Sequence, residues 1–209
     1  MKAVICGAGI GGLALAQRLD TIGWDVVVLE RSPGPRTHGY MIDFFGPGYD
    51  AAEAVGVLPR LHEVGYVVTE MTYRDEEGRR RSGMYYDQVA QVELPQWSRD
   101  RVTLIGDACQ AVSVVAGQGA SLAIAAAYVL ADRLSTAPSI DSALAEYERV
   151  LRPVVADKQE VARKGVRWFV PEARWQLPAR RTALHLARLP LLDRYVADAV
   201  AGKPSAIIS

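Results

Sequence analysis

Three glycines near the start of the chain have the spacing of a phosphate-binding turn. Gly7, Gly9 and Gly12 follow an apolar run, Ala3–Cys6, and precede a helical pattern of apolar residues that stops near Gly23. In such a turn the first glycine permits the sharp change of direction, the second leaves room for a pyrophosphate, and the third lets the helix pack against the strand. The free N–H groups and positive dipole at the helix start favour a phosphate there.

An acidic residue follows this turn at the expected distance. A second apolar run, Val26–Leu29, ends in Glu30. Its carboxylate can accept hydrogen bonds from both hydroxyls of an adenosine ribose, and its charge disfavours a 2′-phosphate, so NADP is the least favoured ligand here. Strand, glycine turn, helix, strand and acid together predict a dinucleotide-binding βαβ unit. The alternative is a glycine-rich turn between two buried strands, without a ligand.

A second group of residues with chemical potential lies about a hundred positions further on. Arg101–Ile105 predicts a buried strand that ends in Gly106 and Asp107, and Gly117–Gly119 opens an apolar helix at about Ala120–Leu134. Ligands bind at the carboxyl ends of strands in open α/β sheets, so Asp107 is expected beside the ligand of the first turn. The helix start could face developing negative charge, such as that of a reduced flavin. The alternative is that Asp107 is a helix N-cap and the glycines serve packing alone.

Proline and glycine divide the remaining chain into shorter elements. The patterns predict a helix at Tyr49–Val55, a hairpin of Val67–Tyr73 and Arg79–Tyr86, a strand at Asp87–Leu94, a loop at Pro95–Asp100, and a helix at Ser139–Leu151 that continues after Pro153 through Val161 to Trp168. The strand at 101–105 is expected beside Ala3–Cys6, unless another segment fills the gap.

Composition excludes several classes of protein. Formal net charge is zero, with net −6 in residues 1–150 (13 Lys+Arg, 19 Asp+Glu) and net +6 in residues 151–209 (11 and 5), so no global field recruits nucleic acid or membrane. Cys6, expected in a buried strand, and Cys109 stand without a ligand cluster, so neither a disulfide framework nor a metal site is expected. No apolar run is long enough to span a bilayer, and the N-terminus is already strand. A cytoplasmic, soluble protein is therefore expected.

Two segments resemble the FAD motifs of the flavin-dependent aromatic hydroxylases, the p-hydroxybenzoate hydroxylase-like monooxygenases. GAGIGGLALAQRL with VVVLER resembles their first motif, and VTLIGDACQAVSVVAGQGASLAIAAAYVLADRL resembles their second. GPRTHGYMIDFFGPGYDAAEAVGVL and YERVLRPVVADKQ are also similar to family segments. The resemblance implies an α/β fold: a Rossmann-like FAD-binding domain with a parallel sheet at residues 1–150, a small β-hairpin insert at about 66–86, and a C-terminal helical tail at 151–209.

The resemblance also implies a cofactor and its contacts. FAD would be reduced by NAD(P)H and would hydroxylate a small aromatic substrate with oxygen. Gly9–Gly12 would hold the pyrophosphate, Glu30 the adenosine ribose and Asp107 the ribityl chain, Gly117–Ala120 would lie by the isoalloxazine, and Arg36 and Asp43 would lie near the nicotinamide and flavin. The full set of expected cofactor contacts is Gly7, Gly9, Ile10, Gly11, Gly12, Glu30, Arg31, Arg36, Asp43, Gly106, Asp107, Gly117, Gln118, Gly119 and Ala120. No catalytic residue is identified.

The chain also departs from this family. Family members are much longer, and the central substrate domain, with its sheet and an Asp-Gly motif, is missing here between about Gly83 and Asp87; the sequence contains no Asp-Gly dipeptide. Gln110, Ala111 and Val114 replace residues that are often aromatic, His or Pro. Three functions stay open: a flavin oxidoreductase, a non-catalytic flavin-binding module or minimal scaffold, and an NAD-binding Rossmann protein, against which the second motif argues. A sheet left uncovered by the missing domain favours a homodimer, through the hairpin or the tail helices.

Overall fold

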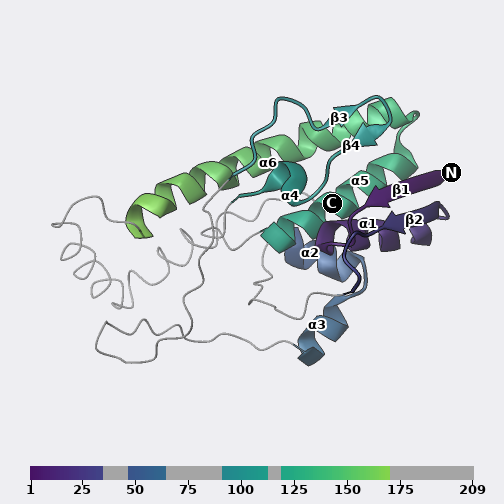
Figure 1. The fold of residues 1–209 in the computed structure, drawn as a ribbon, viewed down its shortest axis with the longest axis horizontal. Helices are drawn as coiled ribbons and strands as arrows, with labels where there is room; N and C mark the ends of the chain where they lie inside the picture. Colours follow the sequence, from purple (N-terminus) through teal and green to yellow (C-terminus); the bar gives the residue numbers. More distant parts are fainter. Residues whose placement is uncertain (35–46, 65–90, 113–118, 170–209) are drawn as a thin grey trace.

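The computed structural model describes residues 1–34, 47–64, 91–112 and 119–169 (Figure 1). The described elements, in chain order, are β1 (Lys2–Cys6), α1 (Ile10–Thr21), β2 (Asp25–Leu29), α2 (Pro47–Ala54), α3 (Leu58–Val64), β3 (Ser98–Arg99), β4 (Val102–Thr103), α4 (Asp107–Gln110), α5 (Gly119–Thr136) and α6 (Ile140–Phe169). Helices and a parallel strand pair confirm the α/β class.

The first thirty residues form the predicted βαβ unit. β1 and β2 pair in parallel, with Ala3 opposite Val26 and Cys6 opposite Leu29, and α1 is the crossover between them. The helix ends where the glycine predicted: Gly23 has φ +81, and its N–H donates to the carbonyl of Asp20 at 2.9 Å. A glycine in this left-handed conformation satisfies the last helical carbonyls without steric strain.

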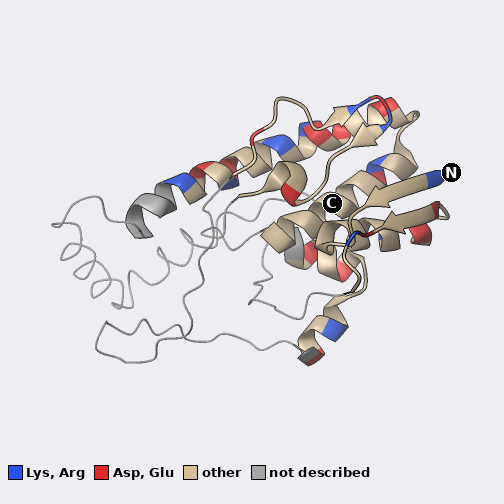
Figure 2. Cartoon of the chain, in the orientation of Figure 1, with Lys and Arg blue, Asp and Glu red and all other residues tan. Residues whose placement is uncertain are grey.

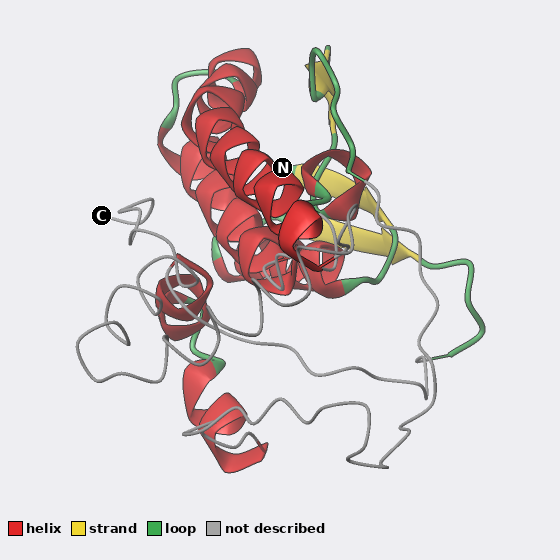
Figure 3. Ribbon diagram, turned by 90° about the vertical axis from the view of Figure 1, so that its left-hand side faces the viewer, coloured by secondary structure: helices red, strands yellow, loops and turns green. Residues whose placement is uncertain are grey.

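Helix α5 forms the centre of the core. Every residue from Ser121 to Ala127 is buried, and the helix packs against α1, α2 and α6. Figure 2 shows charge on α5 only towards its end, at Asp132 and Arg133. A helix that is apolar around most of its circumference is stable only when other elements surround it. Figure 3 shows α5 and α6 side by side, with the strands next to them.

Helix α6 is one continuous helix of 30 residues. Its core-facing side chains recur every three or four positions, at Leu144, Tyr147, Leu151 and Val155. Pro153, which the sequence placed between two helical segments, lies inside the helix on its exposed side. The hydrogen bond that proline cannot donate is therefore lost on a side where water can take its place. The helix also continues without interruption across residue 150, where the expected FAD-binding domain meets the expected C-terminal tail.

The segment before α4 differs from the prediction. Val102–Thr103 pairs antiparallel with Ser98–Arg99, across a turn in which Asp100 has φ +52. A buried strand over Arg101–Ile105 beside β1 is therefore wrong, since Val102 is 69% exposed, and the predicted loop at Pro95–Asp100 contains β3. The hydroxyl groups of Ser98 and Thr103 hydrogen-bond across the pair at 2.9 Å, which favours this local ladder. Leu104 and Ile105 alone pack on the core.

Of the other predicted elements, some are confirmed, some are wrong, and some lie outside the described residues. The helix at Tyr49–Val55 is confirmed as α2, with Gly56 at φ +76 after it, whereas α3 had no prediction. Residues 91–94 form no strand, and Cys6 is exposed although a buried strand was expected. The hairpin at 66–86 and the tail beyond 169 lie outside the described residues. No helix within the described ranges combines the length and apolarity that a membrane crossing requires.

Candidate cofactor site

The glycine turn has two glycines with different surroundings. A Cβ on Gly12 would lie 2.1 Å from the carbonyl oxygen of Gly7, so only glycine lets α1 start this close to the end of β1. A Cβ on Gly9 would meet no atom within 4 Å. The protein therefore fills the space at Gly12 but leaves the space at Gly9 open. Gly7 itself turns the chain with φ +112.

The start of α1 presents free backbone donors to this open space. Gly9 is the N-cap, and its carbonyl accepts the first helical bond, from the N–H of Leu13 at 2.9 Å. No side chain caps the helix start, and its first turn holds no acidic residue. The N–H groups of Ile10, Gly11 and Gly12 precede that first bond, so they are available to an anion at the positive end of the helix.

Glu30 follows β2 and reaches back to the turn. Its carboxylate accepts the N–H of Ser32 and the N–H of Ala8, each at 2.7 Å. These bonds, that from Ser32 first and that from Ala8 second, lower the pKa of Glu30 below its usual 4.5. A carboxylate oxygen accepts more than one hydrogen bond, so both oxygens keep capacity for a ligand. Arg31 is exposed next to it.

The second motif lies at the start of a short helix. Gly106, with φ +64, is the N-cap of α4, and Asp107 is the first helical residue. Asp107 is therefore not the N-cap of α4. Its side chain is exposed, and its Oδ1 lies 3.6 Å from the Cβ position of Gly119, the first residue of α5. The carboxylate and this helix start are therefore neighbours.

Three small residues bring the two motifs together. A Cβ on Gly11 would lie 3.4 Å from the Cβ of Ala123 and 3.7 Å from the Cα of Gly106. Gly106 therefore packs against both Gly11 of α1 and Ala123 of α5. Larger side chains there would push these backbones apart. The two glycine segments, a hundred residues apart in sequence, therefore meet in the folded protein.

Not every expected contact lies within the described ranges. Gly7, Gly9–Gly12, Glu30, Arg31, Gly106, Asp107, Gly119 and Ala120 do, and the distances above link the turn, Glu30, α4 and α5. Arg36, Asp43, Gly117 and Gln118 lie outside the described residues. The described residues contain no group of three or more His, Cys, Asp or Glu side chains that could hold a metal ion.

A buried polar network behind α4 was not predicted from the sequence. Nε2 of Gln110 donates to the hydroxyl of Tyr147 at 2.8 Å, and this hydroxyl donates to the carbonyl of Leu104 at 3.0 Å. Burial raises the pKa of Tyr147 well above its usual value and raises that of Cys109 to about 12, so both stay protonated at neutral pH. The only signal in the sequence was a tyrosine in register with the apolar residues of its helix.

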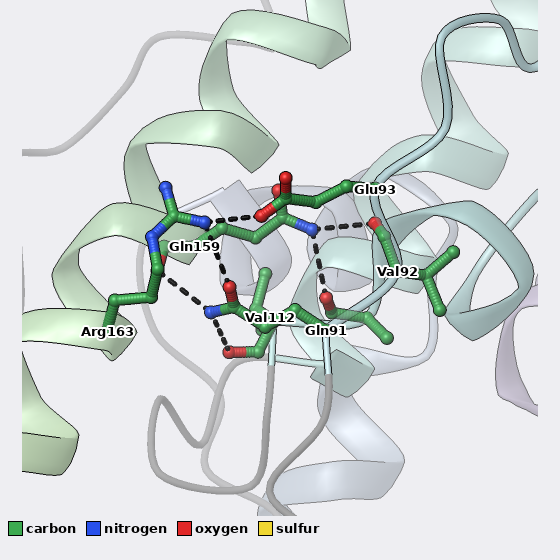
Figure 4. A network of polar contacts seen from close by, with 7 residues as sticks. Gln91, Val92, Glu93, Val112, Gln159 and Arg163 are labelled. Carbon is green, nitrogen blue, oxygen red and sulfur yellow. Dashed lines mark hydrogen bonds and ion pairs between the residues drawn. The ribbon is translucent and has the colours of Figure 1, made fainter.

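A second network joins α6 to the chain on either side of α4. Its members are Gln91, Val92, Glu93, Val112, Gln159 and Arg163, together with the carbonyl of Ala111 (Figure 4). Gln159 is only 6% exposed. A glutamine on the core-facing side of an amphipathic helix is the one feature of the sequence that could have pointed to it.

A parallel βαβ unit with a glycine turn, joined to a carboxylate and a second helix start, defines a Rossmann-like nucleotide-binding protein. Comparison with known families narrows this class, because residues 83–161 match the family model of the FAD binding domain. The match covers the second motif and less than half of the chain. It supports FAD as the cofactor.

Curated relatives support the same identification. FAD-dependent monooxygenase asL6 of Sarocladium schorii is 42% identical over 94 residues, which is 44% of this chain and 22% of that protein. Monooxygenase CTB7 of Cercospora beticola is 33% identical over 101 residues, 47% of this chain and 24% of that protein. The chain thus spans about a quarter or less of these relatives. The resemblance to flavin-dependent monooxygenases is confirmed: the chain is a flavoprotein that resembles their cofactor-binding domain.

Solved structures show the fold alone. The crystal structure of tetracycline destructase Tet(55) superposes with a TM-score of 0.72 over 97% of both chains, at 15% identity. The crystal structure of tetracycline destructase Tet(51) superposes with a TM-score of 0.70 over 98% of both chains, at 14% identity.

Proposed function

We propose that the chain binds FAD where the beginnings of α1 and α5 meet. The observation that carries this proposal is the approach of Gly11 to Gly106, 3.7 Å from Cβ position to Cα, which brings the glycine turn and Asp107 to one site. A nucleotide held at the turn alone would need no carboxylate beside a second helix start. FAD, with a pyrophosphate in its middle and a flavin at one end, can use both.

Each part of the site has a role in this proposal. The N–H groups of Gly9–Gly12 hold the pyrophosphate, and the open space at Gly9 receives it. Glu30, fixed by two backbone N–H groups, accepts the adenosine ribose hydroxyls, with Arg31 beside it. Bound FAD would supply the redox chemistry.

The flavin end depends on the second motif. Asp107 accepts a ribityl hydroxyl, and the start of α5 at Gly119 and Ala120 places positive dipole near the isoalloxazine. Arg36, Asp43, Gly117 and Gln118 complete the site on the strength of the family resemblance.

Identification of the released ligand tests the proposal. The purified protein is heated, and the supernatant is analysed by mass spectrometry; FAD is expected, together with the visible absorption of oxidised flavin before heating. Recovery of NAD, or no uptake of added FAD by the folded protein, contradicts the proposal.

For the whole protein we propose an oxidoreductase that takes electrons from NAD(P)H and acts on a small aromatic substrate, in the cytoplasm. The monooxygenase relatives support this activity. The second candidate is a non-catalytic flavin-binding module, favoured by the small share of those relatives that the chain spans. Oxidation of NADH or NADPH by the FAD-loaded protein separates them: an oxidoreductase turns over, and a module does not.

We also propose a homodimer, because no element within the described ranges packs on one face of the β1–β2 sheet. Val4 is 57% and Leu29 53% exposed, on the face opposite buried Ile5. Parallel sheets are normally covered on both faces.

A further inference from the structure

The carboxamide of Gln159 uses both of its hydrogens on backbone carbonyls. Nε2 donates to the carbonyl of Val92 at 2.9 Å and to that of Ala111 at 3.0 Å (Figure 4). The N–H of Val92 in turn donates to the same carbonyl of Ala111 at 3.3 Å. A buried side chain on α6 therefore holds two chain segments that are 19 residues apart, at the point where they touch.

Gln91 reinforces this contact from the other side. Its Nε2 donates to the main-chain carbonyl of Gln159 at 2.8 Å and to that of Val112 at 3.3 Å. Its Oε1 accepts from the guanidinium of Arg163, which also pairs with Glu93. We call Gln91 and Gln159 the glutamine clamp. Arg163 and Glu93 are largely exposed, so solvent weakens their part.

The clamp fixes one end of α4. This helix has only four residues, Asp107–Gln110, and such a length has little stability of its own. Its orientation depends on what holds its two ends. Gly106 is held between α1 and α5, and Ala111, immediately after the helix, is held by Gln159.

We propose that Gln159 is a positioning residue for Asp107, acting through α4. By holding the carbonyl of Ala111, it sets the direction in which the Asp107 carboxylate faces the start of α5. This inference rests on the proposed FAD site. It predicts that loss of the clamp weakens contacts to the ribityl and flavin part of FAD and leaves contacts at the glycine turn intact.

The test compares FAD with ADP, which lacks the ribityl chain and the flavin and therefore reports on the glycine turn alone. Gln159→Met keeps the length of the side chain and removes both donated bonds. We expect FAD affinity to fall about tenfold or more, as for loss of one or two hydrogen bonds, with ADP affinity unchanged. The absorption band of bound flavin should shift as well.

Arg152→Gln is the matched control. Arg152 ties Leu94 and Pro95 to α6 but has no bond to Ala111 or Val112. Arg152→Gln should lower the melting temperature without changing the ratio of FAD to ADP affinity. Equal loss of both affinities in Gln159→Met, or no loss, overturns the inference.

A double variant tests the route through Asp107. In the Asp107→Ala background, Gln159→Met should change the FAD to ADP ratio no further; an additive loss would mean that Gln159 acts elsewhere. If Gln159→Met does not fold, Gln91→Leu, which removes only the bonds from Gln91, replaces it in the same comparison. If the wild type binds ADP but not FAD, the proposed function fails and this inference falls with it.

Discussion

Two glycines of the turn are needed for different reasons: Gly12 for the stability of the fold, and Gly9 for binding of the cofactor. Gly12→Ala places a Cβ 2.1 Å from the Gly7 carbonyl, and the backbone must shift; we expect destabilisation of roughly 1–3 kcal/mol, more than the roughly 1 kcal/mol that Ala gains over Gly in a helix. In Gly9→Val the Cβ would meet no atom within 4 Å, and the φ of −74 is one that any residue adopts, so the free energy of unfolding should change by no more than about 0.5 kcal/mol while FAD affinity falls. Urea denaturation and FAD titration measure both effects. A Gly9→Val protein with unchanged FAD affinity would place the pyrophosphate elsewhere.

Asp107 is the residue on which the flavin end of the site depends. Because its carboxylate is exposed and Asp107 is not the N-cap of α4, Asp107→Ala should leave the melting temperature nearly unchanged. Loss of a charge-assisted hydrogen bond to the ribityl chain should weaken FAD binding by about 1.5–3 kcal/mol. Isothermal titration of both proteins gives the difference. Equal affinities would show that Asp107 does not touch the cofactor.

Glu30 makes stability depend on acid pH. Its pKa is lowered in the folded protein by the N–H groups of Ser32 and Ala8, so its contribution is present above the usual 4.5 and is lost as pH falls through the lower folded value. We therefore expect Glu30→Gln to melt at a lower temperature than wild type at neutral pH. The difference in melting temperature between the two proteins should narrow as pH falls below 4.5. Thermal melts across this pH range measure the difference. A difference that stays constant with pH would mean that the charge of Glu30 does not contribute to stability.

At the scale of elements, Tyr147 ties α6 to Gln110, the last residue of α4, and to Leu104, which precedes that helix. Tyr147→Phe removes a fully buried hydroxyl and leaves the amide of Gln110 and the carbonyl of Leu104 without this partner. We expect a loss of about 1–3 kcal/mol in the free energy of unfolding. The double variant with Gln110→Met should lose less than the sum of the two single variants, because both partners become apolar. Additive losses would show that the bond carries no coupling.

The elements also show what a sequence can reveal. The βαβ unit was predictable because its glycines, apolar runs and Glu30 are local signals that agree with one another. The pairing of Val102–Thr103 was not, since a short apolar run does not specify its partner strand. Pro153 suggested two segments because sequence alone does not show that it lies on the exposed side of α6. Gln159 could not be assigned a role because its partners are backbone carbonyls, which every residue has.

At the scale of the molecule, the exposed face of the β1–β2 sheet should govern assembly. We define this outer face as Val4, Cys6, Val27 and Leu29, opposite Ile5. Light scattering should give the mass of two chains, and Val4→Asp should give one, because a charge cannot be buried unpaired in an apolar interface. Val102→Asp is the control, since Val102 is 69% exposed on β4 and should not affect mass. A wild-type monomer would contradict the dimer.

Helix α6 also has a consequence for the order of events during synthesis. Val92 and Ala111 leave the ribosome 67 and 48 residues before Gln159, the side chain that joins them. Until then the nascent chain can form the βαβ unit, which needs only nearby residues, but the carbonyl of Ala111, directly after α4, lacks the bond from Gln159. Contacts this distant in sequence form late, since long loops must close first. A ribosome-bound chain stalled before α6 should therefore capture ADP and release FAD quickly.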